Sequence, residues 1–90
     1  MIIINLDRLL SERKMQSAEL ANRLDCTVQT VSRIKTGKIR AIRLSMLNAL
    51  CEQFDCQPGD VLEYVSEAEA VKRYSQAFVD EYNRFHSTGE

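Results

Sequence analysis

Residues 16–37 read QSAELANRLDCTVQTVSRIKTG, and this stretch decides the fold. Its apolar residues recur at helical spacing on both sides of Asp25-Cys26: Leu20, Ala21 and Leu24 before it, and Val31 and Ile34 after it. Thr27 is a favourable N-cap for the second segment, and Gly37 can adopt the left-handed conformation that ends a helix. The stretch therefore predicts two short helices joined by a tight turn.

The residues that such a helix pair buries match the pattern of a helix-turn-helix. Counted from Ser17, the fourth, fifth, eighth, tenth, fifteenth and eighteenth positions are all apolar or small: Leu20, Ala21, Leu24, Cys26, Val31 and Ile34. The fifth position faces the second helix so closely that only a small side chain fits, and Ala21 meets that need. An ordinary helical hairpin would share the periodicity. The small residue at the crossing and the basic segment that follows favour a DNA-binding helix-turn-helix instead.

Charge is distributed unevenly along the chain. Residues 1–45 contain nine Lys or Arg and four Asp or Glu, whereas residues 46–90 contain three and nine. Five of the basic residues fall within eleven positions that hold no acid: Arg33, Lys35, Lys38, Arg40 and Arg43. A basic segment on an otherwise acidic chain indicates one surface that binds a polyanion.

The rest of the first 65 residues predicts three more helices and an N-terminal arm. Ile2 to Ile4 reads as a strand or extended arm, and Asn5 is expected to cap a first helix that ends near Lys14. A fourth helix begins near Leu44, and Gln57-Pro58 opens a fifth. The fourth is expected to bury Leu44, Leu47, Leu50, Cys51 and Phe54, and the fifth Val61, Leu62 and Val65.

Residues 66–90 predict one additional helix. Ser66 and Glu69 match a capping box, and neither Gly nor Pro follows until Gly89. Its apolar residues recur at three- and four-residue steps and are candidates for a dimer interface: Val71, Tyr74, Phe78, Tyr82 and Phe85. This stripe could fold back on its own domain or pair with a second copy of the chain. Its length favours the second copy.

The chain shows no pattern of an enzyme, a metal site or a membrane protein. Cys26, Cys51 and Cys56 include no CxxC pair, and we expect three reduced cysteines that act as small core residues in a cytoplasmic protein. No nucleophile, base and orienting group fall together, and there is no phosphate-binding glycine loop. No apolar run is long enough to span a membrane. We therefore expect no catalytic residue, metal or cofactor.

Residues 16–21 and 27–37 resemble the Cro/CI-type (Xre, lambda-repressor-like) helix-turn-helix family of phage repressors and bacterial regulators. The similarity extends over about residues 5–65, and residues 55–62, DCQPGDVL, are similar to the junction between the fourth and fifth helices of small bacterial members. The resemblance implies an all-α, five-helix DNA-binding domain over residues 1–65. Residues 66–90 lie outside it and would form a dimerisation or packing extension.

Two positions depart from the family pattern. Asp25 stands where the family usually has Gly in the turn, and aspartate tolerates the left-handed conformation better than most residues. Ser17 stands where a glutamine usually binds a DNA phosphate, and its hydroxyl has a shorter reach. Gln16 can partly replace that contact.

The resemblance also implies which residues meet DNA. The base contacts would be Val28, Gln29, Ser32 and Arg33. The phosphate contacts would be Gln16, Ser17, Thr27, Thr30, Lys35, Lys38, Arg40 and Arg43. These residues predict a transcriptional regulator, a repressor by expectation, that binds a palindromic operator as a homodimer. The alternative is an antitoxin-like or adaptor protein whose C-terminal helix binds another protein and for which DNA binding is secondary.

Overall fold

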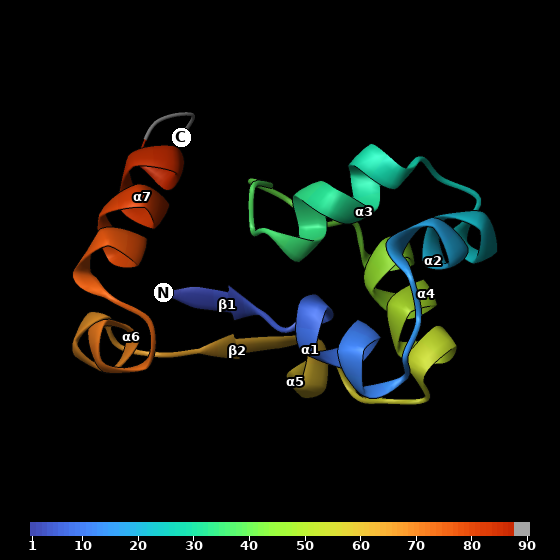
Figure 1. Ribbon diagram of the computed structural model, residues 1–90, viewed down its shortest axis with the longest axis horizontal. Helices are drawn as coiled ribbons and strands as arrows, with labels where there is room; N and C mark the ends of the chain where they lie inside the picture. The colour runs from blue at the N-terminus through green and yellow to red at the C-terminus, as the bar shows by residue number, and fades with distance from the viewer. Residues whose placement is uncertain (88–90) are drawn as a thin grey trace.

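The computed structural model describes residues 1–87, which fold as helices around one short pair of strands (Figure 1). In chain order the elements are β1 (Ile2–Ile4), α1 (Leu6–Glu12), α2 (Ser17–Leu24), α3 (Val28–Lys35), α4 (Leu44–Phe54), α5 (Pro58–Val61), β2 (Leu62–Tyr64), α6 (Glu67–Arg73) and α7 (Gln76–His86). The predicted all-α class and the helix-turn-helix of α2 and α3 are confirmed.

Helices α1 to α5 surround the main hydrophobic core. Its fully buried members include Leu6, Leu20, Val31, Leu50 and Phe54. Ala21 is 3% exposed, which agrees with the prediction of a close contact at this position. Burial of Val31 and Ile34 fixes which face of α3 is turned toward the other helices. The opposite face of α3 is consequently left to solvent.

Left-handed residues are the C-caps of α2 and α4, and others lie just after the C-caps of α1 (Lys14, φ 52°) and α3. Asp25 and Asp55 have φ of 56° and 50°, and Gly37, which follows the C-cap of α3, has φ of 77°. At the first turn the amide of Asp25 donates to the carbonyl of Asn22 (3.3 Å), and that of Cys26 donates to Ala21 (2.9 Å). This is the Schellman pattern, which satisfies the last carbonyls of α2. Asp25 therefore adopts the left-handed helix-ending conformation for which the family usually has glycine.

The N-terminal segment is a strand paired with β2. The register joins Ile2 to Tyr64, Ile3 to Glu63 and Ile4 to Leu62 in antiparallel order. The prediction that the fifth helix buries Leu62 and Val65 is wrong, because α5 ends at Val61 and the chain turns extended at Leu62 (φ −124°, ψ 140°). The β-branched residues of β1 offer an extended partner to which these backbone groups can bond.

The C-terminal segment contains two helices, where one was predicted. The backbone leaves helical conformation at Tyr74 (φ −119°, ψ −82°), and Ser75 then caps α7 by accepting from the amide of Phe78 at 3.0 Å. Ser66 caps α6 in the same way through the amide of Glu69 at 3.1 Å, which is one half of the predicted capping box, while the Glu69 carboxylate accepts from Arg73 at 3.0 Å. The last three residues of the predicted helix, 88–90, lie outside the described residues.

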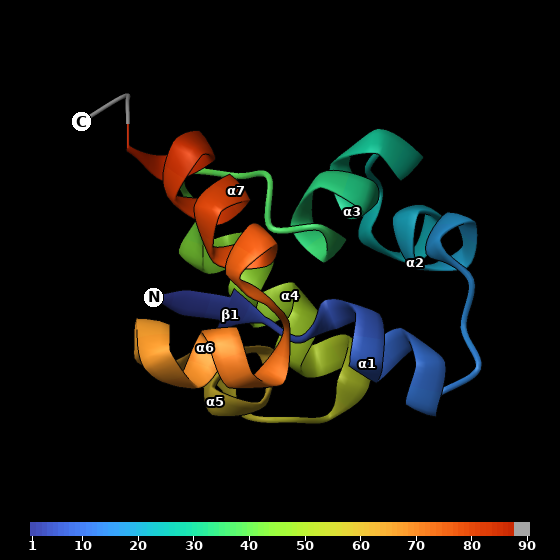
Figure 2. The same cartoon turned by 60° about the vertical axis from the view of Figure 1, so that its left-hand side comes forward.

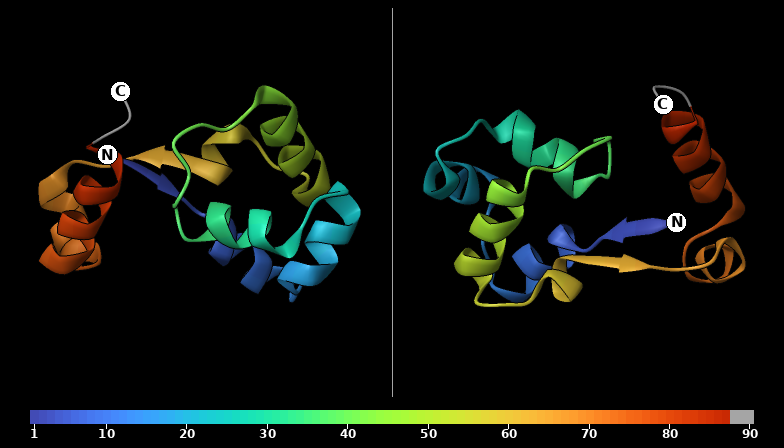
Figure 3. Two further views of the ribbon diagram at one scale, coloured as in Figure 1. Left: turned by 90° about the horizontal axis from the view of Figure 1, so that it is seen from above. Right: turned by 180° about the vertical axis from the view of Figure 1, so that it is seen from behind.

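Helices α6 and α7 fold back on their own chain. Ala70 and Val79 are buried with Ile3 and Val65 in a second hydrophobic cluster, separate from the main core. Figures 1 and 2 show α6 and α7 at one end of the molecule, with β1 and β2 reaching to them from the bundle of α1 to α5. Figure 3 shows the N-terminus beside α6 and α7 as well. The second cluster is therefore formed where α6 and α7 pack against the strand pair.

Two smaller predictions also differ from the structure. Asn5 occupies the N-cap position of α1, but its side chain donates to Glu63 Oε1 at 3.1 Å and makes no capping bond. Leu44 is 82% exposed, because the contact of α4 with the core begins one turn later, at Met46 and Leu47.

The three cysteines are free thiols that pack against the main core, as predicted. Burial raises the pKa of the Cys56 thiol, with a further contribution from the neighbouring Cys51. A raised pKa keeps the thiol protonated near neutral pH, which suits a packing residue rather than a nucleophile.

The conformation at Asp25 makes a stability prediction. Asp25→Val should destabilise the protein by about 1–2 kcal/mol, because a β-branched residue is strained at positive φ, whereas Asp25→Gly should retain or raise stability. Urea unfolding followed by circular dichroism measures both. Equal stability of the Val and Gly variants would contradict the role of this turn.

Candidate nucleic-acid interface

The exposed face of α3 carries the four predicted base-contact residues. Val28, Gln29, Ser32 and Arg33 are exposed, and Val28 is 47% accessible although it is apolar. They lie opposite the buried Val31 and Ile34 along two turns of helix. Within residues 1–87 the Arg33 guanidinium forms no ion pair, so its hydrogen-bond donors are available to a ligand.

The start of α3 is fixed by Thr27. Its hydroxyl accepts from the amide of Thr30 at 3.1 Å and lies 3.0 Å from the Thr30 hydroxyl. This confirms the predicted cap, and the two threonine hydroxyls are also hydrogen-bonded to each other. At the start of α2, Gln16 is exposed at the N-cap without a side-chain capping bond, and Ser17 is half-buried as the first helical residue. Both helix N-termini therefore present amides beside polar side chains.

The basic residues from Lys35 to Arg43 differ in exposure and in their contacts. Lys38 and Arg43 are exposed and form no ion pair within the described residues, whereas Lys35 is half-buried. Arg40 is held by α7: its guanidinium lies 4.6 Å from the centre of the Phe85 ring and donates to the Phe85 carbonyl at 3.1 Å. Arg40 thus differs from the other cations that were assigned to phosphates.

Sequence reasoning missed the contact between α7 and this basic segment. His86 Nε2 donates to the carbonyl of Gly37 at 3.2 Å, and the Tyr82 hydroxyl accepts from the amide of Ile2 at 3.2 Å. The aromatic spacing of Tyr82, Phe85 and His86 was visible in the sequence, but it gave no sign that the partner would be residues 37–40. The helix predicted to bind a second chain therefore contacts the basic segment after α3 of its own chain.

The exposed helix face, the capped N-terminus of α3 and the adjacent cations define a helix-turn-helix DNA-binding domain. The family model for the Cro/C1-type HTH DNA-binding domain matches residues 5–67, and the chain belongs to that family. It is also similar to an uncharacterized HTH-type transcriptional regulator, YozG, of Bacillus subtilis (strain 168). The two are 50% identical over 68 residues, which cover 76% of this chain and 81% of that protein.

The family assignment covers α1 to α5 and ends at the start of α6. Helix α7, which contacts Gly37 and Arg40, lies beyond the matched residues. Among the described residues, no helix has the length and apolar character needed to cross a membrane.

The Thr27 cap provides a second stability prediction. Thr27→Ala should destabilise the protein by about 1 kcal/mol, because the amide of Thr30 loses its acceptor at the first turn of α3. Thr36→Ala is the matched control, since the Thr36 hydroxyl donates only to carbonyls of the preceding turn, Ser32 at 3.0 Å and Arg33 at 3.4 Å. Thermal unfolding should show the larger loss for Thr27→Ala, and the reverse order would contradict this account of the cap.

Proposed function

We propose that the protein is a sequence-specific transcriptional regulator, acting as a repressor in the cytoplasm. The observation that carries the proposal is the solvent-exposed face of α3, which holds Gln29 and Arg33 four residues apart and is followed in the chain by the cations of residues 35–43. The relative in Bacillus subtilis, named as a transcriptional regulator, supports the same reading. A repressor needs only to occupy its operator and exclude other proteins from it.

We propose that α3 reads base edges in the major groove. Gln29 can form two hydrogen bonds with adenine and Arg33 two with guanine, while Val28 can contact a thymine methyl group. Ser32 has a short hydroxyl that serves either as donor or as acceptor. Each bidentate contact is worth about 1–3 kcal/mol of discrimination between bases.

Phosphate contacts would position the domain and supply much of its affinity. The proposed set is Gln16, Ser17, Thr27, Thr30, Lys35, Lys38 and Arg43, with Arg40 included only when it leaves Phe85. Lys38 and Arg43 are the cations of residues 37–43 that are exposed and without an ion pair in the described part of the chain, so we assign them the largest share. Affinity from such contacts falls as salt rises.

We propose that residues 1–65 act as the DNA-binding domain and residues 66–90 as an extension that supports a homodimer. Of the predicted interface residues, Tyr82 and Phe85 are partly covered by their own chain. Val71, Tyr74 and Phe78 remain 36%, 44% and 36% exposed, and we narrow the interface to these three. A two-fold dimer would bind half-sites about 10 base pairs apart in a palindromic operator.

The same exposed residues support a second candidate function. An antitoxin-like or adaptor protein would use Val71, Tyr74 and Phe78 to bind a different protein, with DNA binding secondary. The two functions are distinguished by selection from a random duplex library. Recovery of a preferred sequence supports the regulator, and failure to recover one at any salt concentration contradicts it.

Two alanine variants test the division between base and phosphate contacts. Gln29→Ala should reduce the preference for the selected operator over a scrambled duplex, because a base contact is lost. Lys38→Ala should weaken binding to both duplexes alike and lower the salt slope by about one. Fluorescence anisotropy titrations at several salt concentrations measure both effects. Lys72→Ala on α6 is the control for loss of a charge, and equal loss of specificity in the Gln29 and Lys38 variants would contradict the assignment.

The proposed dimer interface is tested by introducing a charged side chain at Val71. Val71→Glu should raise the dimer dissociation constant about tenfold or more, because association would bury an unpaired carboxylate. Sedimentation velocity measures this, with Leu44→Glu as the control at an equally apolar but more exposed position. A dimer unaffected by Val71→Glu would place the interface elsewhere.

A further inference from the structure

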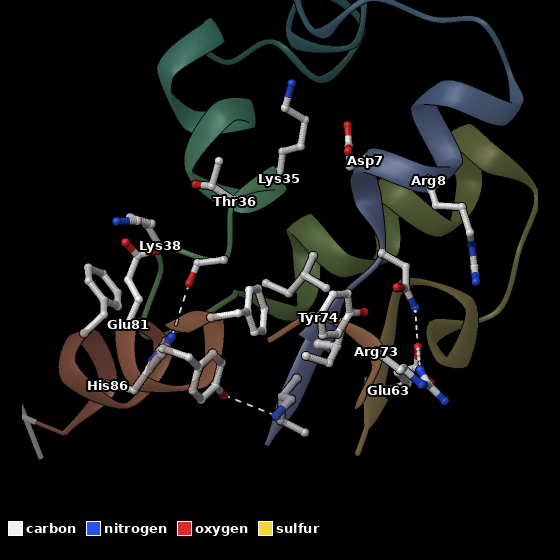
Figure 4. Close-up of a pocket in the computed structure, with 18 residues that line it drawn as sticks. Asp7, Arg8, Lys35, Thr36, Lys38, Glu63, Arg73, Tyr74, Glu81 and His86 are labelled. Atoms are coloured by element: carbon white, nitrogen blue, oxygen red, sulfur yellow. Dashed lines mark hydrogen bonds and ion pairs between the residues drawn. The ribbon is translucent and has the colours of Figure 1, made fainter. Parts of the chain in front are cut away.

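A cleft separates α7 from the end of α3. Its volume is about 430 Å³, and it is bounded by β1, the start of α1, the residues 35–38 and the inner side of α7 (Figure 4). That volume lies within the range of small-molecule sites in proteins, about 300–1,000 Å³. The cleft is formed only because α6 and α7 fold back on the strand pair.

Aromatic side chains form the floor of this cleft. Tyr74 and Phe78 stack with their ring centres 4.5 Å apart and an angle of 29° between planes, and Tyr82 and Phe85 continue the row along α7. Tyr74 and Phe78 remain exposed in spite of their apolar rings. Covering such surface is favourable by about 25 cal/mol per Å², and an aromatic occupant would gain a further contribution from offset-stacked or edge-to-face contact with these rings. The floor therefore selects a planar, apolar occupant.

The charged residues around the cleft are of both signs. Figure 4 shows Asp7 and Lys35 near each other by α1 and α3, and Lys38 near Glu81 of α7. Arg73 and Glu63 form an ion pair at 3.4 Å. The Asn5 amide, followed by the nearby Arg73, holds the pKa of Glu63 below its usual range, so that this carboxylate stays charged against Arg73. Since positive and negative groups accompany each other, the rim does not favour a charged ligand.

We propose that this cleft binds a flat, uncharged, mostly apolar small molecule that stacks on Tyr74 and Phe78. Polar groups at its edges would bond to the Thr36 hydroxyl or to the ammonium and carboxylate groups of the rim. The site uses residues from both the helix-turn-helix region and the C-terminal extension, so neither part forms it alone.

The position of the cleft couples it to DNA contact. One wall is Lys35 to Lys38, which begins two residues after Arg33, and the other is α7, which contacts Arg40 and Gly37. An occupant that moves α7 changes the availability of Arg40 to phosphate. This regulatory part of the inference rests on the proposed function, whereas the binding site does not. If both hold, DNA and the small molecule must alter each other's affinity by the same factor.

Amide NMR titration of the full chain with 2-naphthol, which is flat and uncharged near neutral pH, tests the site without DNA. We expect saturable shifts at Thr36, Lys38, Phe78 and Tyr82, and weaker binding of cyclohexanol, which is not flat, and of 2-naphthoate, which is charged. Phe78→Ala should weaken binding of 2-naphthol about tenfold. Leu44→Ala, which removes an exposed leucine outside the cleft, should leave it unchanged.

Several outcomes would overturn the proposal. One is the absence of saturable shifts at these four residues, and another is equal binding of 2-naphthol and cyclohexanol. If Phe78→Ala disturbs the fold, Tyr74→Ala serves instead, because Tyr74 is more exposed. The proposed dimer would use the same two rings, so 2-naphthol should also lower the dimer fraction in sedimentation. In the monomeric Val71→Glu variant no second chain would cover the rings. If 2-naphthol binds neither the native chain nor this variant, the cleft is not a ligand site.

Discussion

The close crossing of α2 and α3 is the constraint on which the rest of the molecule depends. Ala21 allows the two helices to approach, and the burial of Val31 and Ile34 then fixes the rotation of α3 about its axis. A helix that cannot rotate presents one constant set of side chains to solvent. Base recognition requires that constancy, because a hydrogen-bond pattern is read only when donors and acceptors are held in register with the groove.

The sequence predicted this part of the fold well because the signals are local. Helix periodicity, the Thr27 cap and the left-handed residues Asp25 and Gly37 are each set by residues close in the chain, and all were confirmed. The position of the base-contact residues follows from the same periodicity. Their exposure could therefore be predicted, although their contacts with DNA stay a prediction.

The parts that sequence reasoning missed depend on residues far apart. Pairing of Ile3 with Glu63, the bond from Asn5 to Glu63 and the contact of Phe85 with Arg40 each join segments that no local pattern relates. Asn5 was a reasonable cap by residue type, but its side-chain nitrogen donates to the Glu63 carboxylate and its side chain makes no capping bond to the first turn of α1. The aromatic stripe was recognised, yet its amphipathic pattern is equally compatible with a partner chain and with the same chain. Only the fold shows that part of it is covered internally.

The strand pair has a consequence for how the molecule forms. β1 precedes its partner β2 by about 60 residues, and closing a loop of that length costs more entropy than closing the short loops between neighbouring helices. The contacts among α1 to α4 join residues closer in the chain and so form faster. We therefore expect the helical bundle to assemble while β1 is still unpaired. Helix α7 contacts β1 through the Tyr82 hydroxyl, and its buried Val79 packs with Ile3 and Val65, so we expect it to dock together with the strand pair or after it. We therefore expect α3 to be in place before α7 covers the loop that follows it, and the nascent chain to pass through a state in which Arg40 has not yet met Phe85.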